Sequence, residues 1–215
     1  AFWRLSRKAW DPGAPRALKQ RARWRRPANW LTLCIENRMY TRTPCIGPIS
    51  DSVRSWTEEV YPHLKGAPSA PDAEHPERQV VRTIYNCPDI SRFSPPSAGQ
   101  REEARARLAL PKDAYIMGVA TTNFALKGVG QLIDSLALLP EAAHLCVAGG
   151  RNPLRYKARA KKLGVESRVH FLGKVTDMQG FYHGLDLFIL PTFYDTLGNV
   201  VHEALACGVK TVCSD

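Results

Sequence analysis

The sequence predicts an α/β protein whose second half is an incomplete, doubly wound, Rossmann-like domain built on a parallel sheet. Two observations carry this prediction. From Tyr115 onward, short apolar runs alternate with amphipathic helical patterns. The apolar runs show no polar alternation, which is typical of strands that helices cover on both faces. We therefore expect a parallel sheet between two layers of helices.

Clustered proline, serine and glycine mark a domain boundary near residue 95. These residues fill the segment Arg92–Gly99, which separates two regions of regular periodicity. The sequence therefore predicts one α/β part at residues 1–95 and a second domain at residues 96–215. In the first part we expect a strand, a helix, a loop rich in Pro and Ala, and another strand, at Pro44–Ser50, Asp51–Tyr61, Gly66–Pro76 and Val80–Tyr85.

The periodicity of the second domain predicts strands and helices in strict alternation. The expected strands are Tyr115–Ala120, His144–Ala148, Arg168–Leu172, Leu187–Leu190 and Lys210–Cys213. The expected helices are Val129–Leu139, 153–163, Met178–His183 and Asn199–Ala206. In such sheets ligands bind at the carboxyl ends of the strands, so the loops that follow the strands are the candidate functional segments.

The net charge of +10 is concentrated near the start of the sequence, where residues 1–65 hold 13 Lys and Arg against 5 Asp and Glu. Basic side chains surround Trp24 in the run Lys19–Arg26, a combination that suits anionic lipid headgroups or phosphates. Nucleic acid would be attracted by the same field, and a solvated basic segment is the third interpretation. No apolar stretch approaches the roughly 20 residues of a spanning helix. We expect a cytoplasmic protein that contacts the inner face of the cell membrane at most peripherally.

The six cysteines form no Cys-x-x-Cys pair and have no histidines at zinc-finger spacing. This pattern favours free thiols in a reducing compartment. We expect neither a metal site nor a redox site among them, because buried cysteine usually behaves as a small hydrophobic residue.

The loop before the helix Asn199–Ala206 is the most informative of the loops that follow the strands. Unpaired N–H groups and the positive dipole end near Gly198 favour a diphosphate, and Asn199 is a candidate helix cap. Glu203 lies on the face of Asn199, where its carboxylate suits vicinal ribose hydroxyls, or is simply solvated. Asp195 has an Asx turn as its alternative role.

The loop Thr121–Gly128 offers small polar residues followed by a cation. Lys127 can act there as a point charge for a phosphate, although a surface lysine before a helix is the plainer interpretation. The loop has neither the G-x-G-x-x-G nor the G-x-x-x-x-G-K-[ST] pattern, so a dinucleotide or P-loop site finds no support.

Five ordered motifs resemble the family-4 retaining glycosyltransferases of the GT-B type. They are similar to that family's link into the donor domain, its Lys-Gly, its Val-x-Phe-Leu-Gly, its Glu-x7-Glu and its Glu-Ala-x-Ala-x-Gly helix. In this sequence they stand at Tyr85–Pro95, Lys127–Gly128, Val169–Gly173, Asp195 with Glu203, and Glu203–Gly208. The resemblance is strongest to the branch of the lipopolysaccharide-core glucosyltransferases.

The resemblance implies a GT-B fold, with a donor domain that is incomplete at its C-terminal end and the last part of an acceptor-binding Rossmann-like domain before it. It implies transfer of a hexose or similar sugar from a nucleotide diphosphate, first of all UDP, to a hydroxyl of a glycolipid or polysaccharide, with retention of configuration. No metal or other cofactor and no nucleic-acid partner is expected. We expect a fragment of a longer enzyme, able to bind a nucleotide but not to transfer sugar.

The resemblance also assigns roles to individual residues. Glu203 would hold the ribose, Lys127 and the backbone at Gly198–Val200 the diphosphate, and Val175 the base, while Asp195 would contact a hydroxyl of the donor sugar. The implied donor site is Glu203, Lys127, Gly198, Asn199, Val200, Thr122, Val175 and Leu197, with Asp195 as the catalytic candidate.

Five positions depart from the family pattern. Thr122 stands where the family has a phosphate-binding arginine, and Ala125 stands where a variant of the family has one. One of two phosphate cations is therefore missing, which concerns turnover more than fold. Asp195 is one methylene shorter than the family's glutamate, and Cys87–Pro88 replaces Gly-Val without an interpretable reason.

Two other functions stay open at this point. A nucleotide-sugar epimerase or hydrolase on the same fold would break down or invert the donor without an acceptor. A basic protein that binds membranes or nucleic acid through residues 1–65 would show salt-sensitive binding that persists after Glu203→Ala.

Overall fold

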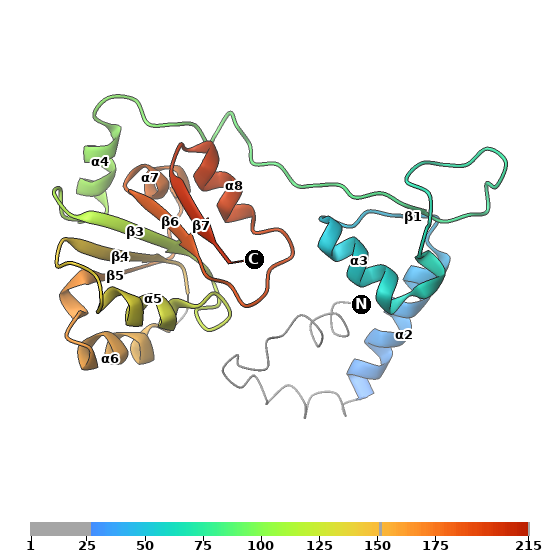
Figure 1. Ribbon diagram of the computed structural model, residues 1–215, viewed down its shortest axis with the longest axis horizontal. Coiled ribbons are helices and arrows are strands. Elements are labelled where there is room, and N and C mark those ends of the chain that lie inside the picture. The colour runs from blue at the N-terminus through green and yellow to red at the C-terminus, as the bar shows by residue number, and fades with distance from the viewer. Residues whose placement is uncertain (1–26, 151, 215) are drawn as a thin grey trace. The chain divides into compact units, whose positions relative to one another are not determined.

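The computed structural model describes residues 27–150 and 152–214, which form two compact units (Figure 1). The described residues up to Asn86 form the first unit together with Tyr194–Leu197, and Cys87–Phe193 with the residues from Gly198 onward form the second. The basic run Lys19–Arg26 lies outside the described residues. The domain boundary near residue 95 stays a prediction.

The first unit is a small α/β layer. Its elements are α2 (Pro27–Arg42), β1 (Cys45–Ile46), α3 (Asp51–Val60), η3 (Pro62–Leu64) and β2 (Val80–Val81). The two strands are parallel, and a small core around Tyr61, Leu64 and Val81 packs beside them. Ser50 caps α3 by accepting a hydrogen bond of 3.2 Å from the Val53 N–H.

Both strands of the first unit are shorter than the sequence predicts. Backbone pairing continues past β1, because Arg82 donates to the Ile46 carbonyl at 3.0 Å and Ile84 to the Pro48 carbonyl at 2.8 Å. Pro48 has no N–H with which to bond in return, so the ladder becomes one-sided and the regular strand ends.

The second unit is built on a five-stranded sheet in the order β5-β4-β3-β6-β7, with every neighbouring pair parallel. The strands are β3 (Tyr115–Ala120), β4 (Ala143–Ala148), β5 (Val169–Gly173), β6 (Leu187–Leu190) and β7 (Lys210–Cys213). The sequence predicted all five to within a residue at each end. The central strands β3 and β4 are buried along most of their length, as the uniformly apolar runs indicated, whereas β5 is half-buried and β7 largely exposed.

Helices cover both faces of this sheet, so the doubly wound fold class is confirmed. The helices are α4 (Gln100–Arg107), α5 (Val129–Leu136), α6 (Leu154–Lys162), η4 (Glu166–Arg168), α7 (Met178–His183) and α8 (Asn199–Ala206). Figure 1 shows α5 and α6 on one face, and α7 and α8 on the other. The α5 helix ends at Leu136, three residues before its predicted end, where the chain tightens into short turns.

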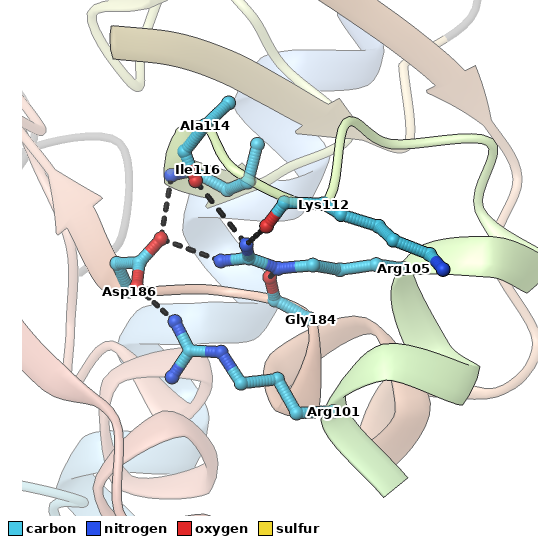
Figure 2. A network of polar contacts seen from close by, with 7 residues as sticks. All are labelled: Arg101, Arg105, Lys112, Ala114, Ile116, Gly184 and Asp186. Atoms are coloured by element: carbon cyan, nitrogen blue, oxygen red, sulfur yellow. Dashed lines mark hydrogen bonds and ion pairs between the residues drawn. The ribbon is translucent and has the colours of Figure 1, made fainter. Parts of the chain in front are cut away.

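A buried arginine joins α4 to the amino edge of the sheet. The Arg105 side chain is 7% exposed, and its guanidinium reaches the Asp186 carboxylate at 2.6 Å. It also donates to the carbonyls of Gly184 at 3.0 Å, Lys112 at 2.5 Å and Ala114 at 3.2 Å (Figure 2). Every polar edge of the guanidinium therefore has an acceptor, which a buried charge requires.

The other partner of this network, Asp186, ties β6 to β3. Its carboxylate accepts the Ile116 N–H at 2.7 Å, and its own N–H donates to the Ile116 carbonyl at 2.8 Å. Arg101, which is 42% exposed, also pairs with this carboxylate (Figure 2). The network thus fixes α4, the start of β3 and the start of β6 against one another.

Arg105→Met should lower the free energy of unfolding by about 3 kcal/mol, because it leaves a partly buried carboxylate and three backbone carbonyls short of a donor. Arg101→Ala is the matched control and should cost less than about 1 kcal/mol, since its side chain is largely in solvent. Urea denaturation of the two variants measures both values. Equal losses of unfolding free energy in the two variants would show that the burial of Arg105 does not determine how much this network stabilises the fold.

Candidate functional site

The strand order reverses between β3 and β6, which makes this junction the expected ligand crevice of the second unit. β4 and β5 extend the sheet on one side of β3, whereas β6 and β7 extend it on the other. The loops after β3 and β6 consequently leave the same edge in divergent directions. In open α/β sheets ligands bind in the opening that this divergence creates.

Direct contacts hold these two loops together. Phe193 donates its N–H to the Leu126 carbonyl at 3.0 Å. Gly128 lies directly against Pro191: a Cβ at position 128 would collide with the Pro191 carbonyl oxygen. Gly128 also has a φ of +67°, in the left-handed region that favours glycine. The predicted Lys127–Gly128 motif is therefore placed beside the segment that follows β6.

The α8 helix starts at the same edge of the sheet, as the sequence predicted. Its N-cap is Gly198, with a φ of +69°, and no side chain caps the first turn. The expectation that Asn199 caps the helix is wrong, because Asn199 is already the first helical residue and its side chain is exposed. An uncapped first turn at the positive end of the helix dipole favours an anion.

Glu203 lies one turn into α8 and is half-buried. The Tyr182 hydroxyl donates to its Oε2 atom at 2.8 Å. Burial raises the pKa of Tyr182 strongly, and the hydrogen bond to Glu203 raises it further, so the hydroxyl stays protonated. The Glu203 carboxylate is thus held by a hydrogen bond on the predicted helix, and it is not a simply solvated side chain.

The loop after β3 presents Thr122 and Lys127 in different settings. Thr122 is exposed, whereas Lys127 is half-buried. Local bonds shape the loop: Thr121 Oγ1 accepts the Asn123 N–H at 2.9 Å, and Asn123 Oδ1 accepts the Leu126 N–H at 3.1 Å. These side-chain caps bend the backbone so that Lys127 comes at the start of α5.

Val175 lies in the loop after β5, the edge strand of the sheet. It is half-buried and lines a cavity of about 400 Å³ between this loop and the end of α4. Arg107 and Asp177 form an ion pair of 3.3 Å among the other lining residues. The residue predicted to contact a base therefore borders a hollow with both apolar and charged walls.

Asp195 and Leu197 lie in the segment that groups with the first unit. Glu203 and Lys127 belong to the second unit. The Asp195 Oδ1 atom accepts the N–H of its neighbour Thr196 at 2.8 Å. The catalytic role of Asp195 stays a prediction, as do the individual roles of the other donor-site residues.

The described residues contain no group of three or more His, Cys, Asp or Glu side chains that could hold a metal ion. The cysteines carry no disulfide. The described part of the chain also has no helix long and apolar enough to cross a membrane.

The sequence pattern of the family described as Glycosyl transferases group 1 matches residues 100–215, which is more than half of the chain. The chain belongs to this family. The match covers the sheet, the loops at its carboxyl edge and α8, so the glycosyl transferases group 1 membership rests on the part of the chain that carries the candidate site.

Two curated glycosylation and sugar-phosphate enzymes are similar in sequence to this chain. The lipopolysaccharide glucosyltransferase WaaG of Escherichia coli is 30% identical over 141 residues, which are 64% of this chain and 37% of that protein. Mannosylfructose-phosphate synthase of Agrobacterium fabrum is 34% identical over 151 residues, with 63% and 33% covered. The chain therefore spans about a third of the length of the curated relatives that it matches.

Solved structures show the same fold. WaaG, a glycosyltransferase of lipopolysaccharide biosynthesis, matches with a TM-score of 0.71 and 20% identity, over 94% of this chain and 55% of that chain. HepE of Anabaena, in complex with UDP-glucose, matches with a TM-score of 0.68 and 22% identity, over 82% and 46%. The likeness confirms the predicted GT-B architecture.

Sequence reasoning missed Tyr182, the partner of Glu203. A tyrosine in the apolar run before β6 is the one available signal, because a buried hydroxyl usually needs a hydrogen-bond partner. Nothing in the sequence says that this partner is Glu203, which lies 21 residues further along the chain.

Gly128→Ala should destabilise the protein by about 1–2 kcal/mol or more, from the left-handed backbone conformation and the collision with Pro191. Gly130→Ala is the control two residues away. Gly130 is helical and its nearest neighbour would lie 3.8 Å from a Cβ, so this variant should gain up to about 1 kcal/mol. Opposite signs in thermal unfolding are the expected result, and a loss of equal size in both variants would contradict the close contact at Gly128.

Proposed function

We propose that this chain carries the donor-binding part of a retaining hexosyltransferase, which moves a sugar from UDP to a hydroxyl of a glycolipid or polysaccharide. Membership of glycosyl transferases group 1 supports the reaction class. One observation carries the proposal for this chain: the loop with Lys127 and the start of α8 leave neighbouring strands at the point where the strand order reverses.

The diphosphate is assigned to the N-terminus of α8 and to Lys127. α5 also starts at this edge, but its first N–H group, that of Val129, already donates to the Phe124 carbonyl at 3.0 Å. Both helices begin at a glycine with no side-chain cap. In α8 the Val201 N–H donates to the Gly198 carbonyl at 2.8 Å, and the two N–H groups before it have no intrahelical partner. A helix N-terminus contributes about half a positive charge, to which Lys127 adds a full one.

The ribose and the base are assigned to Glu203 and Val175. Val175 follows β5 and α8 follows β6, and these strands are separated by β4 and β3. We propose that the base lies over the cavity beside Val175 and the phosphates at the start of α8, with the ribose between them and in contact with Glu203.

UDP-glucose is the donor that comparison favours, because HepE of Anabaena was solved in complex with it. A glycolipid acceptor is favoured by the relative that is a lipopolysaccharide glucosyltransferase. We further propose that Asp195 contacts the donor sugar and that the reaction needs no metal, since Lys127 and the α8 dipole would offset the charge of the departing diphosphate. The basic residues within 1–65 would hold the protein peripherally at the anionic inner face of the membrane.

Calorimetric titration of this chain with UDP, GDP and ADP, each with and without magnesium, tests the proposal. We expect selective binding of UDP with the same affinity in both conditions. Binding of none of the three by the folded chain would contradict the donor site, and binding only with magnesium would contradict the metal-free mechanism.

Glu203→Ala should weaken UDP binding by roughly 1–3 kcal/mol, because the ribose hydroxyls lose a charged acceptor. Glu103→Ala, which removes an exposed glutamate of α4, is the matched control and should bind UDP as the parent does. The same calorimetric titration measures both dissociation constants. An unchanged affinity in Glu203→Ala would remove this residue from the site.

Lys127→Ala should weaken UDP binding by about 1.5–3 kcal/mol while leaving uridine binding nearly unchanged, because a point charge acts on the phosphates alone. Lys161→Ala, on the exposed side of α6, controls for the loss of one positive charge. Competition titrations with UDP and uridine separate the two effects. A parallel loss for both ligands would make Lys127 a structural residue of the loop.

A further inference from the structure

Tyr182 is held rigidly inside the second unit. Its side chain is fully buried, and its ring makes edge contacts with Phe93, Phe181 and Phe188 at centroid distances of 6.0, 5.4 and 5.6 Å. Such edge-to-face contacts from several sides leave the ring one orientation. The position of the hydroxyl is thereby fixed by the core.

The Tyr182 hydroxyl reaches out of this core to a single acceptor. It donates to Oε2 of Glu203 at 2.8 Å, and among the described residues no other side-chain hydrogen bond to Glu203 is found. A glutamate on a helix surface otherwise samples several rotamers. With Oε2 held by the tyrosine, Oε1 is the oxygen of this half-buried carboxylate for which the described residues show no side-chain hydrogen bond.

We propose that Tyr182 is a positioning residue for the donor site, which holds Glu203 in the rotamer that receives the vicinal hydroxyls of a ribose. This inference rests on the proposed function and assigns the source of its specificity for ribose. A carboxylate oriented in advance loses less conformational freedom when the ligand binds, so the bond to Tyr182 strengthens the contact between Glu203 and the ribose. Tyr182 itself touches no ligand.

Tyr182→Phe is the decisive variant because it removes the hydroxyl and keeps the ring among its aromatic neighbours. Calorimetry gives its dissociation constants for UDP and for 2′,3′-dideoxy-UDP, which lacks both ribose hydroxyls. We expect UDP to bind about three- to ten-fold more weakly than to the parent, with the dideoxy nucleotide unaffected. A purely structural role would weaken both nucleotides by the same factor, and that result would overturn the inference.

Two further variants sharpen the test. Tyr156→Phe removes the hydroxyl of another buried tyrosine of the same unit, away from Glu203, and should leave both dissociation constants unchanged. In a Glu203→Ala background Tyr182→Phe should add no further loss, because the hydroxyl then has no carboxylate to position. Additive losses would overturn the inference.

The comparison also separates this inference from the proposed function. A parent protein that binds UDP and dideoxy-UDP equally well would contradict the ribose contact of Glu203, and with it both proposals. A parent that prefers UDP, with the same preference retained in Tyr182→Phe, would leave the donor site intact and overturn only the role of Tyr182.

Discussion

The junction between β3 and β6 is the constraint on which the second unit depends. Only Met117 with Leu187 and Gly118 with Phe188 are in register there, against six pairs between β3 and β4. Because this ladder is so short, contacts at its two ends must contribute much of the stability of the junction. At the amino end Asp186 exchanges hydrogen bonds with the Ile116 backbone, and at the carboxyl end the loops meet through their own contacts. The contacts between the two loops therefore stabilise the sheet and also shape the edge at which we propose that the ligand binds.

Function and stability consequently share residues at this junction. Gly128 fits against Pro191, which holds the Lys127 loop beside the chain that leaves β6. A larger residue at position 128 would move the cation as well as strain the backbone. On the amino side, by contrast, the Arg105 network lies far from the ligand edge along the strands, so changes there act on stability first. Stability and the proposed binding are therefore coupled at the carboxyl end of this strand pair, whereas the amino end serves stability.

The sheet and α8 could be predicted because their signal is local. Apolar runs indicated the strands and the 3.6-residue period indicated the helices, and the structure has each predicted strand of the second unit at its expected place. α4 was missed, because only Ala104 and Arg105 are buried and it has no apolar face to recognise. Its attachment depends on Arg105 reaching Asp186, 81 residues away. The candidate site residues could be inferred from the order of the family motifs along the chain. The hydrogen bond between Tyr182 and Glu203 could not, because it depends on how α7 and α8 lie in the fold, which no local sequence pattern reports.

The absence of an arginine at Thr122 gives the ribose contact more weight in the donor site that we propose. Thr122 and Ala125 are both exposed and uncharged, so neither adds to the charge of Lys127 and the helix dipole. Diphosphate affinity then rests on fewer charges, and a lysine lacks the bidentate geometry of a guanidinium. When fewer charges hold the diphosphate, binding depends more on how well the hydrogen bonds to the ribose are oriented. For this reason a buried tyrosine that fixes one carboxylate oxygen of Glu203 matters more here than it would beside two phosphate cations.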